Sequence, residues 1–246
     1  MNADEYRKMA EVEDAMWYYR ALHGHVARAL DQGLGAREAA KILDAGCGTG
    51  GLIRRLAPAR TGWRWAGVDA EPLACARARE RATGAEIREG SVTALPWADG
   101  FFDAVVSADV IYHVEDDAAA LREFSRVLRP GGSAVINVPA YRWLWSYHDV
   151  ATHAQRRYGR GELIAKLRAA GFGEVQATHW NALPLPLLMV RRKLLPAPAA
   201  GSDVQLYPGP VEAVFNAAMA LERGWLRAVG RLPWGSSLLA VARKAG

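Results

Sequence analysis

The chain has 246 residues, of which 51% are hydrophobic, so it can bury a full core as one domain or as one domain with an elaboration. Its net charge of +5 invites a nucleic-acid or anionic-membrane partner, but the arginines are scattered through predicted helices, so we expect no nucleic-acid binding. Two cysteines, a polar beginning and the lack of an apolar run of about 20 residues lead us to expect a cytoplasmic protein with no disulfide framework, secretory signal or membrane-spanning helix.

A glycine-rich turn follows the first predicted strand, residues 41–45. Gly46, Gly48 and Gly50 allow a tight turn and a close approach of the backbone to a ligand, and Asp44 adds a carboxylate at the strand end. The motif lacks the lysine of a phosphate-binding P-loop, whereas Gly51 leaves a dinucleotide site open. The turn predicts a cofactor loop.

The second predicted strand, residues 64–68, ends in Asp69. In α/β nucleotide sites an acid at this position binds the ribose hydroxyls, although a surface acid at a strand end is the simpler alternative. Because Asp44 and the glycine loop lie upstream, we favour Asp69 as a ribose ligand.

Strands and helices alternate along the rest of the chain. Strands are predicted at 85–89, 102–108, 133–138, 173–178 and 238–242, and helices at 51–57, 72–82, 117–128 and 160–170. Such alternation predicts an α/β fold, a parallel sheet with helices on both faces.

In this order the motifs resemble the class I S-adenosylmethionine-dependent methyltransferases over roughly residues 40–178. Residues 43–50 match the family's first motif nearly letter for letter, residues 90–96 resemble the loop beside the adenine, and residues 128–132 resemble the turn before the fifth strand. The resemblance implies a Rossmann-like seven-stranded sheet, a methyltransferase activity and S-adenosylmethionine as the cofactor. The cofactor residues that it implies are Asp44, Gly46, Cys47, Gly48, Asp69, Ala70, Ser91, Val92 and Asp109.

One departure from the family pattern is Ser91, where many relatives have an aspartate that binds the adenine amino group. Adenine recognition is therefore expected to fall to the backbone of Ser91 and Val92.

Four parts are expected along the chain: an N-terminal helical lid at 1–40, the cofactor-binding core at 41–179, a helical or apolar insertion at 180–234 and a final core strand at 235–246. The aromatic run at 16–20 suits a lid over the cofactor, although aromatic residues at helical spacing are more often core.

The insertion separates two strands that form a close antiparallel pair in the resembling fold. Its apolar stretch at 183–190 contains Pro184 and Pro186, which count against a regular helix, and a helix with one apolar face is predicted at 211–229. The apolar faces could fold back as core or form a dimer interface. Alternatively, the insertion caps the acceptor site and contacts an anionic membrane, with Trp180 near the interface and Arg191, Arg192 and Lys193 on lipid phosphates.

A polar segment at 147–158 follows the fifth strand, at the edge where open α/β sheets bind ligands. Its histidines lack a specific metal-binding spacing, so no metal is expected. His148 and His113 are the candidate proton acceptors. The candidate acceptor contacts are His153, Arg156, Arg157 and Tyr158, with a structural hydrogen-bond network as the alternative.

Together, the 147–158 segment, the N-terminal aromatic run and the insertion resemble a bacterial methyltransferase subgroup associated with cell-surface glycan and lipid metabolism. This resemblance implies methyl transfer to an O, N or C nucleophile of a hydrophobic or lipid-linked acceptor, with peripheral contact at the inner membrane surface. Two alternatives stay open: a soluble enzyme for a small molecule or natural product, with the insertion as lid or dimer surface, and a non-catalytic cofactor-binding protein.

Overall fold

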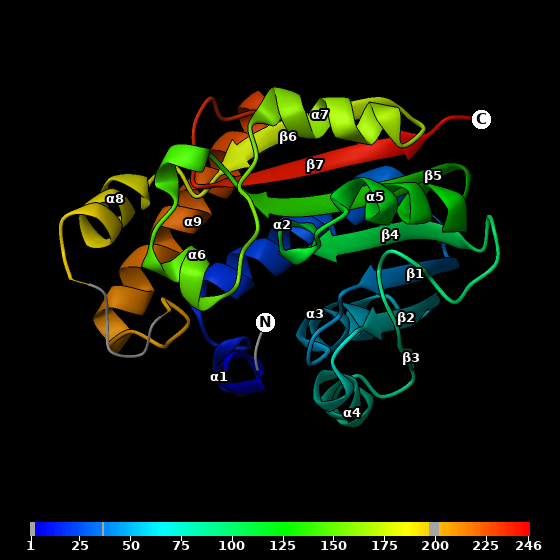
Figure 1. Cartoon of the computed structure of the whole chain (residues 1–246), viewed down its shortest axis with the longest axis horizontal. Helices are drawn as coiled ribbons and strands as arrows, with labels where there is room; N and C mark the ends of the chain where they lie inside the picture. The colour runs from blue at the N-terminus through cyan, green and yellow to red at the C-terminus, as the bar shows by residue number, and fades with distance from the viewer. Residues whose placement is uncertain (1–2, 36, 197–201) are drawn as a thin grey trace.

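The computed structural model describes residues 3–35, 37–196 and 202–246. They contain a seven-stranded sheet in the order β3-β2-β1-β4-β5-β7-β6, in which β7 runs antiparallel to both its neighbours and the other pairs are parallel. The strands are β1 (Ala40–Ala45), β2 (Trp63–Asp69), β3 (Glu86–Glu89), β4 (Phe102–Ala108), β5 (Leu128–Pro139), β6 (Phe172–Trp180) and β7 (Ser237–Lys244). The predicted Rossmann-like sheet with an insertion between the last two strands is confirmed (Figure 1).

Helices cover both faces of the sheet. One face carries α2 (Trp17–Leu34), α3 (Gly51–Leu56) and α4 (Pro72–Arg81), and the other carries α5 (Asp117–Val127) and α7 (Arg160–Ala169). Neighbouring residues of β1 show the alternation: Ile42 packs into the first layer and Leu43 into the second. Because both faces are covered, the inner strands β1 and β4 are buried along most of their length.

The region from α5 to the start of β5 agrees with the prediction at one boundary and differs from it at another. The helix α5 begins as expected, since Asp116 caps it by accepting a hydrogen bond from the Ala119 backbone N–H at 2.8 Å. The strand β5, however, starts at Leu128 rather than at 133, and the predicted turn is an irregularity in its pairing with β4. Gly131, with φ of 71°, supplies the conformation that this irregularity needs.

The apolar stretch after β6 forms a helix, α8 (Leu185–Lys193), against the expectation from its prolines. Pro184 is the N-cap and Pro186 lies in the first turn, where no N–H is needed for the helix ladder. Both prolines therefore start the helix instead of breaking it.

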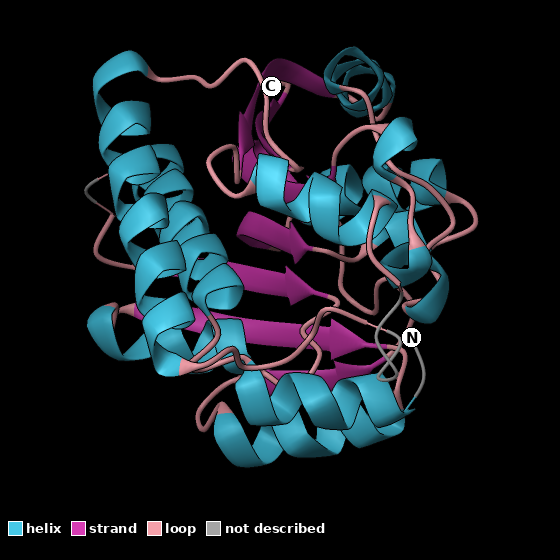
Figure 2. Cartoon of the chain, turned by 90° about the vertical axis from the view of Figure 1, so that its left-hand side faces the viewer, coloured by secondary structure: helices cyan, strands magenta, loops and turns pink. Residues whose placement is uncertain are grey.

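The long helix of the insertion, α9 (Gly209–Val229), lies beside α2 (Figure 2). Met219 and Leu226 join the core beneath it, and Phe215 stacks on Trp17 with ring centroids 4.7 Å apart. By contrast, Val214 and Trp225 point outward. The single apolar face predicted for this helix is thus divided into a packed side and an exposed side.

The N-terminal segment also divides into two parts. The helix α2 belongs to the core, with Val26 and Leu30 fully buried, whereas α1 (Ala3–Val12) lies near the carboxyl ends of β1 and β2 (Figure 1). The lid therefore stays a prediction for α1. Short elements complete the fold: η1 (Ala57–Ala59), η2 (Ile111–His113), η3 (Arg142–Leu144) and α6 (Tyr147–Ala151).

Candidate cofactor and acceptor site

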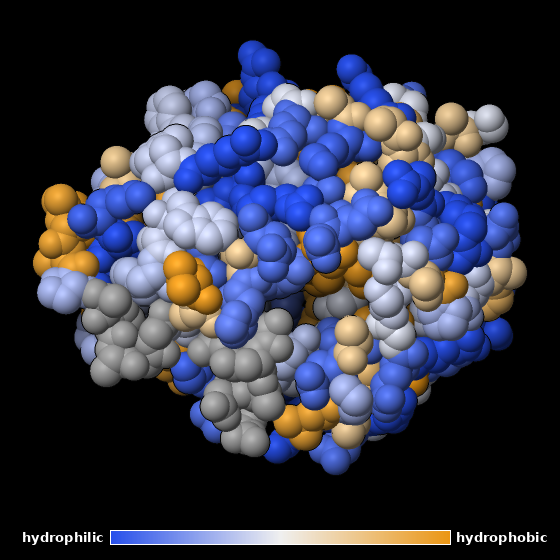
Figure 3. All heavy atoms as spheres, in the orientation of Figure 1, coloured by the Kyte–Doolittle hydropathy of each residue, from blue (hydrophilic) through white to orange (hydrophobic). Residues whose placement is uncertain are grey.

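A cavity of about 400 Å³ opens at the carboxyl ends of β1, β2 and β4. Figure 3 shows a hollow near the middle of the face that Figure 1 presents. All nine residues that the sequence proposed for the cofactor line the cavity: Asp44, Gly46, Cys47, Gly48, Asp69, Ala70, Ser91, Val92 and Asp109. They lie at or just beyond the carboxyl ends of β1, β2, β3 and β4, which the parallel sheet brings to one edge.

The glycine turn bridges β1 and β2 through backbone bonds. The N–H groups of Gly46 and Cys47 both donate to the carbonyl of Val68, at 2.7 and 2.9 Å. Gly46 has φ of 87°, and a Cβ on it would collide with the side chain of Val110. The turn is therefore tight enough to bring bare backbone to the cavity.

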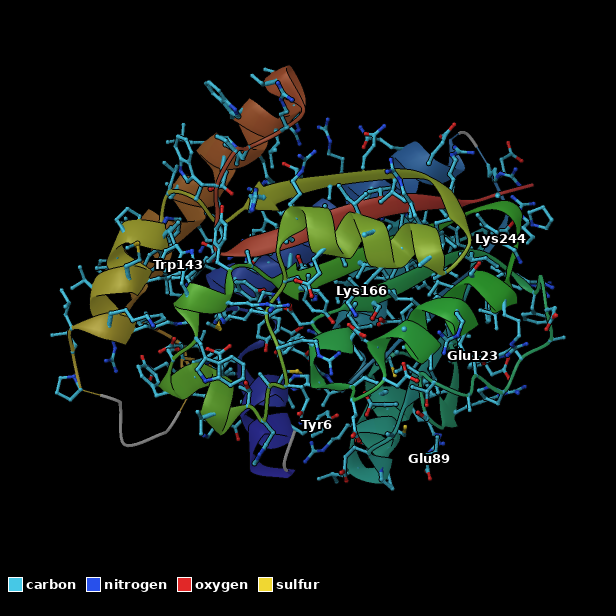
Figure 4. The ribbon with its side chains drawn as sticks, turned by 45° about the horizontal axis from the view of Figure 1, so that its top comes forward. Tyr6, Glu89, Glu123, Trp143, Lys166 and Lys244 are labelled. Carbon is cyan, nitrogen blue, oxygen red and sulfur yellow. The ribbon has the colours of Figure 1, made fainter. Side chains whose placement is uncertain are left out.

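Asp69 ends β2 with its carboxylate held against this turn. Its Oδ2 accepts from the Gly48 N–H at 2.9 Å, and its Oδ1 accepts from the Glu71 N–H and from the Tyr6 hydroxyl, both at 3.0 Å. Figure 4 shows Tyr6 between α1 and α4. The sequence motif gave no sign of Tyr6, because it lies 63 residues from Asp69 along the chain.

Several buried acids make the cofactor half of the cavity suited to a cation. Within the described residues Asp44 has no hydrogen-bond or ion-pair partner, and burial together with Asp69 and Glu13 raises the pKa of Asp44 to about 8. Glu13 itself hydrogen-bonds Thr49 at 2.5 Å and pairs with Arg81. The carboxylate of Asp69, whose hydrogen bonds come only from neutral N–H and O–H donors, would repel a dinucleotide pyrophosphate and attract a sulfonium and an ammonium group, and a bound cation would also favour the ionised form of Asp44. The residues present therefore fit S-adenosylmethionine.

Asp109 follows β4 with φ of 59° and belongs to an internal network. Its Oδ2 accepts from the Tyr18 hydroxyl and its Oδ1 from the Asn137 amide, each at 2.8 Å. Trp180 donates in turn to Asn137 at 2.8 Å and is fully buried. Burial raises the pKa of Asp109 to about 6. Trp180 thus ties β6 to the site and does not lie at a surface, contrary to its predicted membrane contact.

The 147–158 segment is largely a structural network. Arg157 is buried, donates to both oxygens of Asp149 at 2.6 and 3.0 Å, and donates to the carbonyl of Ala140 at 3.1 Å. Arg156 donates to the carbonyl of Glu115 at 2.7 Å, and Tyr158 is a core residue.

Of the four predicted acceptor contacts only Arg157 lines the cavity. The structure does not bring His153, Arg156 or Tyr158 to it, because His153 points to solvent and the other two side chains are committed to Asp117.

The two candidate proton acceptors, His148 and His113, both line the cavity, but they carry the ring proton on different nitrogen atoms. His148 Nδ1 accepts from the Asp203 N–H at 3.1 Å, so the neutral ring carries its proton on Nε2 and can only donate. His113 Nδ1 lies 3.4 Å from the carbonyl of His153, which can only accept, so its Nε2 lone pair is open. Burial lowers the pKa of His148 to about 3 and that of His113 to about 4.

The insertion supplies part of the other half of the cavity. Leu188 and Arg192 reach it from α8, and Arg192 pairs with the buried Asp203 at 2.8 Å. Tyr112 and Asn181 also line it. In the part of the chain that the structure describes, no group of His, Cys, Asp and Glu is placed to hold a metal, and no helix is long and apolar enough to cross a bilayer.

The chain is similar in sequence to known proteins. A family model described as a methyltransferase domain matches residues 43–136. A probable S-adenosylmethionine-dependent methyltransferase of Mycolicibacterium smegmatis is 32% identical over 168 residues, which cover 68% of this chain and 62% of the relative. A demethylmenaquinone methyltransferase of Chlorobaculum parvum is 38% identical over 122 residues, which cover 50% of this chain and 49% of the relative. The chain thus spans 62% and 49% of the length of these two relatives.

A solved structure extends the likeness to nearly the whole fold. The putative methyltransferase of Haloferax volcanii, solved in complex with the Trm112 methyltransferase activator, has a TM-score of 0.61 and 21% identity, covering 99% of this chain and 95% of that one. The chain therefore contains a methyltransferase domain with the class I, S-adenosylmethionine-dependent fold.

Proposed function

We propose that the protein transfers the methyl group of S-adenosylmethionine to an O, N or C nucleophile of a hydrophobic or lipid-linked acceptor. The bound cofactor supplies an electrophilic methyl group together with its own leaving group. The protein has to align the nucleophile, exclude water and take up a proton where the acceptor releases one.

The observation that carries the proposal is the position of α8 between the cavity and an exposed apolar surface. Its inner side contributes Leu188 to the cavity, while Leu187 and Leu194 on its outer side are 57% and 76% exposed. Figure 3 shows hydrophobic side chains at the edge of the molecule where Figure 1 places α8, and Figure 4 shows Trp143 beside this helix. An apolar acceptor could pass from this surface to the cavity with its chain shielded from water.

The basic run at the end of α8 contributes less to membrane contact than the sequence suggested. Arg192 is turned inward to Asp203, Lys193 donates to the carbonyl of Trp145 at 2.8 Å, and Arg191 donates to the carbonyl of Pro196 at 2.7 Å. A peripheral contact with anionic lipid would thus rest on the exposed leucines, with Arg191 and Lys193 at its rim.

Within the cavity, His113 is the better placed of the two histidines to accept a proton, since its Nε2 is open. His148 and Arg192 would instead donate to oxygen atoms of the acceptor. A relative that acts on demethylmenaquinone is consistent with an apolar acceptor.

The direct test is methyl transfer from labelled cofactor to an extract of the source organism, separated into lipid and aqueous fractions. We expect label in the lipid fraction. Label confined to small molecules of the aqueous fraction would support the soluble alternative, and the absence of label from both fractions would support the non-catalytic one.

A second arm uses the double variant Leu187→Glu and Leu194→Glu, with Leu73→Glu and Phe101→Glu as the control on exposed apolar residues elsewhere. The first variant should lose flotation with anionic vesicles and transfer to lipid, and both should bind S-adenosylhomocysteine like the wild type. Equal flotation of both variants would contradict the role of α8.

A further inference from the structure

A second cavity lies on the opposite side of α2 from the cofactor site, in the groove between α2 and α9. It measures about 550 Å³ and is lined by both helices. The aliphatic part of the Arg223 side chain lies over Gly24 of α2. None of the residues considered above for cofactor or acceptor lines this groove.

Three arginines line the groove without an anionic partner. Arg28 comes from α2, and Arg223 and Arg227 come from α9. Within the described residues none of the three forms an ion pair or a hydrogen bond. The one acid of the lining, Asp31, is already bound by Arg60 through three contacts of 2.8 to 3.0 Å. The groove therefore holds an excess of positive charge, which Glu222 beside Arg223 offsets only in part.

The clustering of arginines affects the pKa of Arg223. Burial and the nearby Arg227, Arg20 and Arg55 lower its pKa. Guanidinium groups gathered in this way repel one another, and an anion between them would turn the repulsion into attraction.

A buried, unsatisfied histidine gives an independent sign of a ligand. His25 lines the groove, is 4% exposed, and its Nε2 has no hydrogen-bond partner among the described residues. A buried polar atom without a partner carries a desolvation penalty that a ligand could relieve. Arg28 and Arg223 are close enough to His25 to act on its charge.

We infer that the groove between α2 and α9 is a binding site for a phosphate group, held by Arg28, Arg223 and Arg227 with His25 at its floor. Arginine forks match the oxygen geometry of phosphate, and a P–OH group would donate to the open Nε2 of His25. The phosphate could belong to a soluble metabolite or to a lipid headgroup. The site is independent of methyl transfer, so its failure would leave the proposed function standing.

The first arm of the test titrates inorganic phosphate into the full-length protein by calorimetry, with chloride at equal ionic strength as the reference. We expect saturable binding. Two variants remove arginines of the site, each from a different helix: the double variant Arg223→Gln and Arg227→Gln on α9, and Arg28→Gln on α2. Each should weaken phosphate binding at least about tenfold. Melting in chloride checks that the variants are folded.

The matched control is the double variant Arg77→Gln and Arg168→Gln, which removes the same net charge from exposed residues on α4 and α7. It should bind phosphate like the wild type.

The second arm distinguishes the sources of the phosphate. Because the leucines of α8 remain in all of these proteins, the comparison is between the α9 variant and the wild type. If the site takes a lipid headgroup, the α9 variant should float with phosphatidylglycerol vesicles less than the wild type and the control do. If the source is soluble, the three proteins should float equally while the α9 variant binds inorganic phosphate more weakly. The absence of phosphate binding by the wild type, or equal phosphate binding by the wild type, the α9 variant and the α2 variant, would overturn the inference.

Discussion

Asp44 lies in an environment that is suited to a bound cationic ligand. It is a buried carboxyl at the end of β1, close to Asp69 and Glu13, and no cation lies beside it in the described residues. Its raised pKa of about 8 means that the free protein keeps a proton there which the unfolded chain would lose.

Replacing this residue should therefore change how stability depends on pH. An aspartate in the unfolded chain titrates near pH 3.9, so the wild type loses unfolding free energy as pH rises from about 4 to 8, by up to about 1.4 kcal/mol per pH unit. Asp44→Asn lacks this loss. In urea unfolding, the unfolding free energy of the variant should increase relative to that of the wild type as pH rises through this window.

The exposed Glu80→Gln serves as the control and should follow the wild type at every pH. A constant stability difference between Asp44→Asn and the wild type across the window would show that Asp44 is not protonated in the free protein.

The cofactor residues could be predicted from the sequence because they lie in short contiguous motifs at strand ends. Asp44 and the glycine turn follow one strand and Asp69 the next, so local pattern fixed their place. Residues such as Tyr6 and Asp203 could not be found in this way, since they reach the cavity from distant segments through contacts that leave no periodic trace. That Arg156 and Tyr158 do not line the cavity has a related reason: a polar residue near a site looks the same in sequence whether it faces the ligand or the protein.

At the scale of elements, α9 is held in place by a carboxylate that points inward. Glu222 is buried and accepts the backbone N–H groups of Asn181, Ala182 and Leu183, where the chain leaves β6. The helix thereby fixes the corner at which Asn181 lines the cavity. The sequence predicted α9 from its apolar spacing but gave no indication of this anchor, because an acid on a helix is normally read as solvent-facing.

Removing the anchor should destabilise the protein. Glu222→Ala leaves three donors without an acceptor, and each buried unsatisfied donor costs about 1 to 3 kcal/mol. Glu222→Gln keeps one acceptor oxygen and should lose less. Urea unfolding measures both, with the exposed Glu80→Ala as the reference. Equal midpoints for Glu222→Ala and Glu80→Ala would mean that the corner holds without the carboxylate.

The arrangement of the whole molecule followed from the alternation of strands and helices and from the ordered motifs, and the seven-stranded sheet with its methyltransferase fold is confirmed. The outward side of the insertion could not be foreseen. A helix such as α9 has apolar residues on more than one side, and the tertiary packing of Phe215, Met219 and Leu226 decides which side is covered.

The central claim is that the turn at 44–50 and Asp69 bind S-adenosylmethionine, and calorimetric titration with S-adenosylhomocysteine tests it most directly. The wild type should bind, and Asp69→Ala should lose about 1 to 3 kcal/mol of binding free energy, because ribose hydroxyls would lose a carboxylate acceptor. Glu89→Ala is the matched control, since Glu89 ends β3 as Asp69 ends β2 but is exposed and lies outside the cavity (Figure 4). It should bind like the wild type. Unchanged affinity in Asp69→Ala, or a wild type that prefers NAD, would contradict the assignment.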